Sequence, residues 1–333
     1  MFKNISIIGD GAMGTVLANL LCEKGLSVKM WGHDKGQLDK IRSAGENIFF
    51  LPGYKLPETL ELESRDDFIM KDCDLMISAV PCQFMRGVWS RLKSHVPAGV
   101  AILSVAKGIE NTTSLRPDEI LQDVLGRDNK CVVFSGPTIA DELMKKLPAT
   151  ACVACDDIEL AKKVQHVLSD GVGWLRVYTN TDVLGVELAG AMKNVIAIAA
   201  GIIDGIGAGD NAKAALLTRG LAEISRLGIA LGADEHTFAG LTGLGDLVTT
   251  CVSPKGRNRS FGERIGRGQT VEKAKQSTVS VIEGIATCKS VIELAQKHNV
   301  EMPITEAVYS ILFEDKTVNQ AITDLMGRRL KSE

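Results

Sequence analysis

The sequence predicts an α/β protein in which an N-terminal, doubly wound sheet is followed by an all-α C-terminal domain. Over the first third, short apolar runs alternate with helical patterns, as in a parallel sheet covered by helices. A glycine-rich hexapeptide at residues 9–14 follows the first apolar run directly. After residue 182 the strand-like runs give way to long helical periodicity. A chain of 333 residues is longer than one core usually holds, so two domains are expected.

The expected elements follow in chain order. Apolar runs predict strands at residues 5–8, 28–31, 75–79, 100–105 and 131–134, and the stretches between them predict helices at 14–24, 35–44 and 85–94. A further strand pair at 149–154 and 173–178 is expected to extend the sheet around a helix at 158–168. A long helix is expected from about Thr181. We place the domain boundary inside this helix, which gives domains of residues 1–190 and 191–333.

Composition excludes several classes of protein. The hydrophobic fraction of 45% and the charged fraction of 24% are ordinary for soluble globular chains and exclude a disordered or collagen-like polymer. A net charge of −3 and an aromatic fraction of 5% argue against a nucleic-acid partner. The 33 glycines predict many tight turns and close backbone approaches.

The eight cysteines are spread through apolar or helical surroundings. The closest pair, Cys152 and Cys155, falls inside a strand-like run, whereas a redox or zinc site needs a turn there, and zinc needs a second pair of ligands. We therefore expect reduced, buried thiols and no metal site, as in a cytoplasmic protein.

Neither a leader segment nor a membrane span is expected. The first four residues run straight into the first strand without a cleavable apolar segment. The most apolar later stretch, residues 195–203, has about nine residues between the charged Lys193 and Asp204, whereas a span needs roughly 20.

Residues 9–14 read Gly-Asp-Gly-Ala-Met-Gly and lie between a strand and a helix, the position of the phosphate loop in Rossmann-type domains. Gly9 would make the tight turn, Gly11 would let the backbone approach a pyrophosphate, and Gly14 would let helix and strand pack closely. The amides at the helix start would hold the negative charge. A glycine-rich turn without a ligand is the alternative.

The tip of the second strand bears on the choice of dinucleotide. An NAD site favours a carboxylate there for the ribose 2′-hydroxyl, but the expected tip residue is Gly32, with the acid displaced to Asp34. His33 could neighbour a 2′-phosphate, or could be a solvated loop histidine. NADP(H) is therefore permitted beside NAD(H).

Two lysines occur in apolar settings. Lys107 follows the strand expected at 100–105, at the carboxyl edge of the sheet where ligands bind. Lys193 lies on a helix that is otherwise almost entirely small or apolar. Reduction of a carbonyl builds negative charge on oxygen, which a cation or proton donor must meet, and desolvation lowers the pKa of a lysine toward neutrality. A surface lysine with a buried stem is the alternative for either residue.

Two later segments are rich in hydrogen-bonding groups. Asp246 lies after two glycines at an expected helix start, either as part of a site or as a simple N-cap. Residues 255–259 read Lys-Gly-Arg-Asn-Arg. The guanidinium of Arg257 suits two-point contact with a phosphate monoester, and a solvated basic loop is the alternative.

These motifs together resemble the bacterial form of the NAD(P)-dependent sn-glycerol-3-phosphate dehydrogenases over essentially the full length. The matching stretches lie at residues 9–15, 104–109, 135–138, 187–194, 209–215, 243–247 and 257–259. The resemblance implies a dinucleotide-binding domain followed by a helical substrate and dimerisation domain. It also implies a cytoplasmic homodimer that supplies glycerol 3-phosphate for phospholipids.

The resemblance also implies roles for individual residues. Lys193 would be the catalytic acid/base, Lys107 would supply positive charge, and Asp246 would orient Lys193. The substrate would contact Lys107, Gly136, Thr138, Lys193, Asp246, Gly256, Arg257 and Asn258, with its phosphate on Arg257 and Asn258. The cofactor would contact Gly9, Gly11, Ala12, Met13, Gly14, His33, Lys107, Ala140, Arg257, Val281 and Glu283.

The sequence departs from the family at the phosphate loop and in the basic turn. Ala12 and Met13 stand where many members carry a serine and an aromatic residue, and Gly256 replaces a common serine. The expected reaction is reduction of dihydroxyacetone phosphate by NAD(P)H. Two alternatives remain open: a related hydroxy-acid dehydrogenase, with Arg257 on a carboxylate, and a sensor that binds NAD(P) without turnover.

Overall fold

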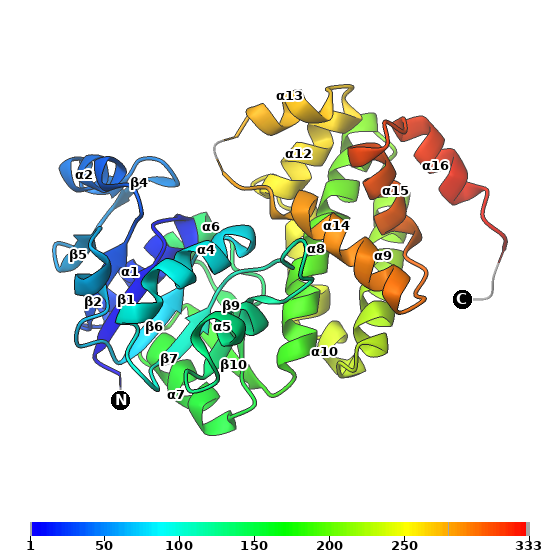
Figure 1. Cartoon of the computed structure of the whole chain (residues 1–333). Coiled ribbons are helices and arrows are strands. Elements are labelled where there is room, and N and C mark those ends of the chain that lie inside the picture. Colours follow the sequence, from blue (N-terminus) through cyan, green and yellow to red (C-terminus); the bar gives the residue numbers. More distant parts are fainter. Residues whose placement is uncertain (1, 279, 331–333) are drawn as a thin grey trace. The chain divides into compact units, whose positions relative to one another are not determined.

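The computed structural model describes residues 2–278 and 280–330 (Figure 1). The described chain divides into two compact units. The first contains residues up to 107 and residues 116–183, and the second contains the loop 108–115 and the residues from 184 onward.

The first unit is built on an eight-stranded sheet in the order β10-β9-β8-β7-β6-β1-β2-β5. Its strands are β1 (Asn4–Ile8), β2 (Ser27–Trp31), β5 (Leu60–Glu63), β6 (Leu75–Ser78), β7 (Ala101–Ser104), β8 (Cys131–Ser135), β9 (Ala149–Ala154) and β10 (Leu175–Asn180). Neighbouring strands are parallel except β8 and β9, which pair antiparallel with Phe134 opposite Val153. The predicted strands are confirmed, including the pair that extends the sheet beyond β8.

Three short strands were not predicted. β5 pairs with β2 at the edge of the sheet, and its sequence Leu-Glu-Leu-Glu is too short an alternation to predict a strand. A separate two-stranded sheet joins β3 (Glu46–Asn47) to β4 (Leu51–Lys55). β5 and the two-stranded sheet lie at the margin of the unit, where partial exposure makes the alternation of hydrophobic and polar residues less regular.

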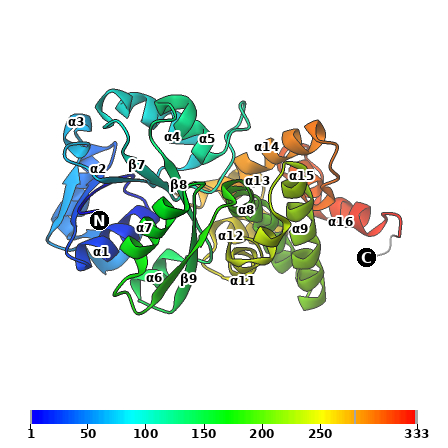
Figure 2. The ribbon, with the colours of Figure 1, turned by 90° about the horizontal axis from the view of Figure 1, so that it is seen from below.

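Helices cover both faces of the large sheet, as the doubly wound prediction requires. Figure 2 shows α1, α6 and α7 together on one face and α4 beside α5 on the other. The helices of this unit are α1 (Ala12–Glu23), α2 (Lys35–Ala44), α3 (Asp66–Ile69), α4 (Cys82–Leu92), the short η1 (Lys93–His95), α5 (Pro117–Leu125), α6 (Ala140–Met144) and α7 (Ile158–Ser169). Because both faces are covered, the central strands β6 and β7 are buried at every position.

In the second unit, residues 184–278 and 280–330 form helices joined by loops, and residues 108–115 form a loop without helix or strand. Its elements are α8 (Val183–Ile206), which begins at the last residue of the first unit, then α9 (Asp210–Ala230), α10 (Glu235–Ala239), the π-helical turn η2 (Leu241–Gly245), α11 (Asp246–Val252), α12 (Arg257–Gly266), α13 (Val271–Gln276), α14 (Glu283–Lys297), α15 (Pro303–Phe313) and α16 (Val318–Met326). The absence of strands from this described part confirms the predicted all-α region.

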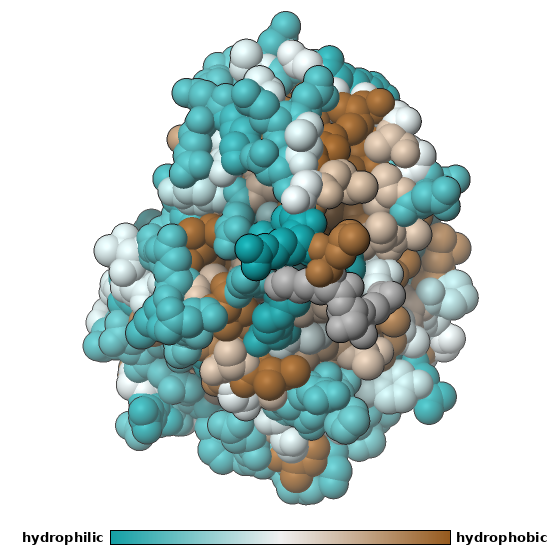
Figure 3. Space-filling model, turned by 90° about the vertical axis from the view of Figure 1, so that its right-hand side faces the viewer, coloured by the Kyte–Doolittle hydropathy of each residue, from teal (hydrophilic) through white to brown (hydrophobic). Residues whose placement is uncertain are grey.

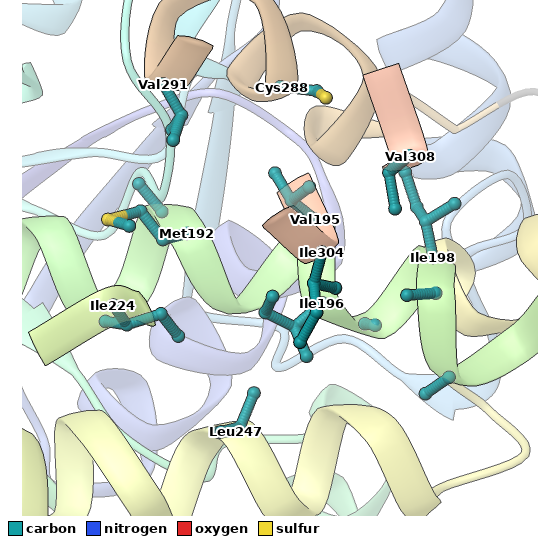
Figure 4. Packing of buried hydrophobic residues seen from close by; sticks show 14 of the residues in the cluster. Met192, Val195, Ile196, Ile198, Ile224, Leu247, Cys288, Val291, Ile304 and Val308 are labelled. Atoms are coloured by element: carbon teal, nitrogen blue, oxygen red, sulfur yellow. The ribbon is translucent and has the colours of Figure 1, made fainter. Parts of the chain in front are cut away.

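The core of the second unit forms around α8. Figure 4 shows the buried side chains that α8 and its neighbours contribute: Met192, Val195, Ile196, Ile198, Ile224, Leu247, Cys288, Val291, Ile304 and Val308. The apolar stretch of α8 is longer than the nine residues expected, because the flanking Ala-rich turns are apolar as well. By length and composition α8 could cross a membrane, but 94% of the relevant window is buried inside the protein, as in a core helix.

Candidate active site

Lys193 lies on the buried helix α8, and its side chain is only 7% exposed. Its ammonium group donates to Asp246 Oδ1 and, at 2.7 Å, to Thr250 Oγ1. Thr250 in turn donates to the carbonyl oxygen of Asp246 at 2.6 Å. Asp246 is the first residue of α11, and its carboxylate binds the ammonium rather than capping the helix. A buried ammonium held by a carboxylate and a hydroxyl has a fixed direction, as a proton donor requires.

The segment after α11 holds the predicted basic turn. Gly256 is the N-cap of α12, whose first two residues are Arg257 and Asn258. The Arg257 side chain is exposed, whereas Asn258 is buried. The first amides of a helix have no partner within the helix, so this turn combines free backbone donors with an exposed guanidinium.

The side chain of Asn258 joins two helices. Its Nδ2 donates to Asn194 Oδ1 at 2.9 Å, and its Oδ1 accepts from the Gly284 amide at 3.0 Å. Asn194 follows Lys193 on α8, and Gly284 follows Glu283 at the start of α14. The amide predicted to hold a phosphate therefore also holds α8 and α14 together, which leaves one Nδ2 hydrogen beyond these two bonds.

In the first unit, Lys107, Gly136 and Thr138, which are predicted to contact the substrate, lie close together. Lys107 Nζ and Thr138 Oγ1 each donate to the Gly136 carbonyl oxygen at 3.0 Å. Gly136 follows β8 with a φ of +122°, where a side chain would be strained, and a Cβ there would lie 3.1 Å from Ala151 Cα. Glycine is therefore required for the turn that presents its carbonyl group to Lys107.

The glycine loop has the geometry that its sequence predicts. Gly9 has a φ of +117°, and a Cβ there would lie 2.7 Å from the Ala79 carbonyl oxygen. A Cβ on Gly14 would collide with the backbone of Gly9, whereas one on Gly11 would meet open space. Gly9 and Gly14 therefore serve packing, and Gly11, the N-cap of α1, leaves room for a ligand to approach the helix start.

The residue that follows β2 is Gly32, so no carboxylate faces the glycine loop from this position. A Cβ on Gly32 would lie 2.9 Å from Asp10 Oδ2, so the loop itself occupies this space. Asp34 is the N-cap of α2, where its Oδ1 accepts from the Gln37 amide at 3.1 Å. His33 is exposed between them. His33 is therefore accessible to solvent, whereas the carboxylate of Asp34 caps α2.

The remaining predicted residues lie at helix starts. Ala140 is the first residue of α6, and Ala12 and Met13 are the first residues of α1, all of them partly buried. Val281 and Glu283 lie just before and at the start of α14 and are partly buried as well.

Six of the eight cysteines are buried, and Cys73 and Cys131 are partly buried. All eight are free thiols, and the described residues contain no group of His, Cys, Asp or Glu side chains that could hold a metal. Burial raises the pKa of Cys152 to about 11 and that of Cys251 to about 12. Both thiols stay protonated at neutral pH, so Cys251 is not an activated nucleophile beside the Lys193 ion pair.

Comparison with known proteins identifies the family. Residues 4–161 match the model of the NAD-dependent glycerol-3-phosphate dehydrogenase N-terminus, and residues 182–323 match that of the C-terminus. The chain belongs to the glycerol-3-phosphate dehydrogenase family. It is 44% identical over 332 residues to a glycerol-3-phosphate dehydrogenase [NAD(P)+] of Corynebacterium glutamicum, with 99% of each chain covered.

Other members of the glycerol-3-phosphate dehydrogenase family agree. The enzyme of Chlorobium limicola is 45% identical over 332 residues, with 99% of each chain covered. The crystal structure of the Coxiella burnetii glycerol-3-phosphate dehydrogenase superposes with a TM-score of 0.94 at 37% identity and covers 98% of this chain and 99% of that one. The predicted family and fold class are therefore confirmed.

The dehydrogenase cofactor fits the first unit. A dinucleotide pyrophosphate needs open space at a helix N-terminus, and Gly11 provides it at the start of the 12-residue helix α1. The first turn of α1 contains no acidic side chain that would repel the phosphates. The replacement of serine and an aromatic residue by Ala12 and Met13 removes no backbone donor from this loop.

The sequence pattern did not indicate two residues that bind the predicted site residues, Thr250 and Asn194. Thr250 lies four residues after Asp246 on α11, so both side chains share a helix face, and this spacing was an available signal. Asn194 follows a lysine in an apolar helix, but nothing local indicates a partner 64 residues away.

Proposed function

We propose that this chain reduces dihydroxyacetone phosphate to sn-glycerol 3-phosphate with NAD(P)H, reversibly, and so supplies glycerophospholipid synthesis. The observation that carries the proposal is the buried Lys193, held by Asp246 and Thr250 in a chain of the glycerol-3-phosphate dehydrogenase family. A hydroxyl product requires one proton on oxygen, and Lys193 is the oriented acid that can donate it.

Each residue has a separate task in this proposal. When bound, the reduced nicotinamide supplies hydride to the ketone carbon. Lys193 donates the proton to the developing alkoxide, and Asp246 and Thr250 hold its ammonium in direction. Lys107 supplies positive charge, and its bond to the Gly136 carbonyl group fixes the ammonium position.

The substrate phosphate is assigned to the start of α12. Arg257 offers a two-point guanidinium contact, and Asn258 offers its remaining amide hydrogen. Gly256 has no side chain, so it can contribute only through its backbone. Gly136 and Thr138 complete the substrate contacts. Binding energy gained at this remote phosphate positions the carbonyl group for reaction.

The proposed cofactor contacts are those that the family resemblance implies. The pyrophosphate would lie on Gly9, Gly11 and Gly14, beside Ala12 and Met13. The other proposed contacts are His33, Lys107, Ala140, Arg257, Val281 and Glu283. Because Asp34 caps α2 and His33 is exposed, we propose that a 2′-phosphate is tolerated.

A comparison of NADH and NADPH oxidation with dihydroxyacetone phosphate tests the function. We expect turnover with this ketone and none above background with 2-keto acids. Preference for a 2-keto acid would favour the hydroxy-acid dehydrogenase, in which Arg257 binds a carboxylate. Cofactor binding without loss of the reduced-nicotinamide absorbance would favour the sensor, although a sensor has no need of a buried proton donor.

We also propose that the protein is a cytoplasmic homodimer, with dinucleotide binding in residues 1–190 and substrate binding and dimerisation in residues 191–333. Leu244, Val248 and Val252 recur every fourth residue along η2 and α11 and are 42%, 38% and 51% exposed. Figure 3 shows hydrophobic residues among hydrophilic ones on the face turned toward the viewer. Sedimentation of the wild type and of Val248→Glu tests the dimer, which the charge should weaken.

A further inference from the structure

The two arginines that flank Asn258 have different surroundings. Arg257 is exposed, whereas the side chain of Arg259 is only 12% exposed. Arg259 Nη2 lies 2.5 Å from Asp204 Oδ2, near the end of α8. Arg257 is therefore available to a ligand, while the charge of Arg259 is used within the protein.

Asp204 binds Arg259 together with a second cation. Lys213 Nζ lies 2.7 Å and 2.9 Å from the two carboxylate oxygens of Asp204, and both side chains are 19% exposed. Arg259 Nη1 also lies 3.4 Å from Glu263 Oε2, one turn further along α12. The network joins α8, α9 and α12, and its low exposure limits screening by solvent and salt.

The ion pair lies where α8 and α12 touch through their backbones. A Cβ on Gly201 of α8 would lie 2.8 Å from the Arg259 carbonyl carbon, and a Cβ on Gly262 of α12 would lie 2.9 Å from the Ile198 carbonyl carbon. Backbones this close leave no room for one helix to slide without breaking the contact. The Arg259–Asp204 pair thus ties the first turn of α12 to α8 at a close crossing.

Both helices carry residues of the proposed mechanism. Lys193 precedes Asp204 on α8 by about three helical turns, and Arg257 precedes Arg259 in the first turn of α12. We propose that Arg259 is a positioning residue that, through Asp204, sets the spacing between the proton donor and the phosphate-binding turn. The inference rests on the proposed function, because it assumes that Arg257 binds the substrate phosphate.

This role predicts a particular kinetic signature. If the first turn of α12 moves, the phosphate contact weakens while the proton donor keeps its own partners on α11. Arg259→Met should therefore lower the ratio of kcat/KM for dihydroxyacetone phosphate to kcat/KM for dihydroxyacetone by about tenfold, mainly through KM. This ratio does not depend on the fraction of folded enzyme, so a loss of stability alone leaves it unchanged.

The test compares Arg259→Met, Asp204→Asn, the double variant, Arg259→Lys and two reference variants. Each single change should lower the ratio, and the double variant should lower it little further than Arg259→Met, because both changes remove the shared Arg259–Asp204 ion pair. Arg259→Lys keeps the charge, so its ratio should lie between that of the wild type and those of Arg259→Met and Asp204→Asn. Arg267→Met, which removes another cation bound to Glu263 but is 67% exposed, should leave the ratio unchanged.

Arg257→Met separates this inference from the proposed function. A lowered ratio in Arg257→Met with an unchanged ratio in Arg259→Met and Asp204→Asn overturns the positioning role alone. An unchanged ratio in Arg257→Met overturns the phosphate assignment, and the positioning role with it. If Arg259→Met does not fold, Asp204→Asn and Arg259→Lys give the same measurement.

Discussion

The ammonium group of Lys193 donates to the carboxylate of Asp246, 53 residues further along the chain, and both side chains are almost completely buried. A buried ion pair of this kind is costly to break on one side, because the remaining charge stays without compensation. Any substitution of Lys193 must therefore be judged by both turnover and stability.

Replacement of Lys193 by methionine should remove the proton donor while keeping the volume of the side chain. We expect kcat to fall by about 10³-fold. The affinity for NAD(P)H should stay within about twofold, because the proposed proton transfer adds nothing to cofactor binding. Steady-state kinetics and a cofactor fluorescence titration check this, with a thermal melt to confirm folding. Undiminished turnover would remove the catalytic assignment.

Thr250→Val should weaken the orientation of Lys193 without removing its charge. The hydroxyl accepts a hydrogen bond from the ammonium beside the Asp246 carboxylate, so we expect kcat to fall about tenfold. Thr249→Val is the matched control, since its hydroxyl donates to the Gly245 carbonyl oxygen and not to a partner in the site. Equal kcat values for the two variants would contradict the role of Thr250.

Arg257→Ala should mainly weaken binding of the phosphorylated substrate. Loss of a two-point charged contact should lower kcat/KM for dihydroxyacetone phosphate by about 10²-fold. Lys255→Ala, which removes an exposed charge from the same turn, should have little effect. The same loss with unphosphorylated dihydroxyacetone would show that Arg257 does not bind the phosphate.

Gly11→Ala and Gly14→Ala should separate cofactor binding from packing. Gly11 has a φ of −72° and open space at its Cβ position, so alanine should leave the melting temperature nearly unchanged and weaken NAD(P)H binding. Alanine at position 14 would collide with the Gly9 backbone and should lower stability. Calorimetric melting and cofactor titration distinguish the two. Tight cofactor binding by Gly11→Ala would argue against a pyrophosphate on this loop.

Glu223 should make stability depend on pH. Its carboxylate accepts from the amides of Ile304 and Thr305 at the start of α15, and burial raises its pKa to about 7. The folded protein then binds this proton more tightly than the unfolded chain, in which the carboxyl has an ordinary pKa near 4.5. The resulting stability is fully present below about pH 4.5 and is lost as pH rises through about 7.

The loss at Glu223 amounts to about 3 kcal/mol at most. The side chain of Glu223→Gln cannot ionise. As the pH rises from 5 to 8, the unfolding free energy of the wild type should therefore fall relative to that of the variant. Denaturant unfolding at both pH values measures this shift. The exposed Glu235→Gln serves as the control. A difference that does not change with pH would contradict the raised pKa.

Much of the fold and part of the site could be predicted from local pattern. The order of strands and helices, the glycine loop and the helical second unit follow from periodicity, which burial imposes residue by residue. Lys107 and Lys193 could be identified because a charged side chain in an apolar segment is costly to bury without a partner. β3, β4 and β5 were missed because short, half-exposed strands leave little pattern.

The sequence by itself determined which groups could act: a glycine loop at a helix start, a lysine in an apolar helix, and a basic turn. Only the tertiary structure decided their partners. In the structure, Asp246 and Thr250 bind the ammonium of Lys193, and Asn258 forms hydrogen bonds with Asn194 and Gly284. Arg259 forms an ion pair with Asp204, whereas Arg257 is exposed. The physical reason is that hydrogen bonds and ion pairs join atoms brought together by packing, and packing joins segments whose separation along the chain carries no local signal.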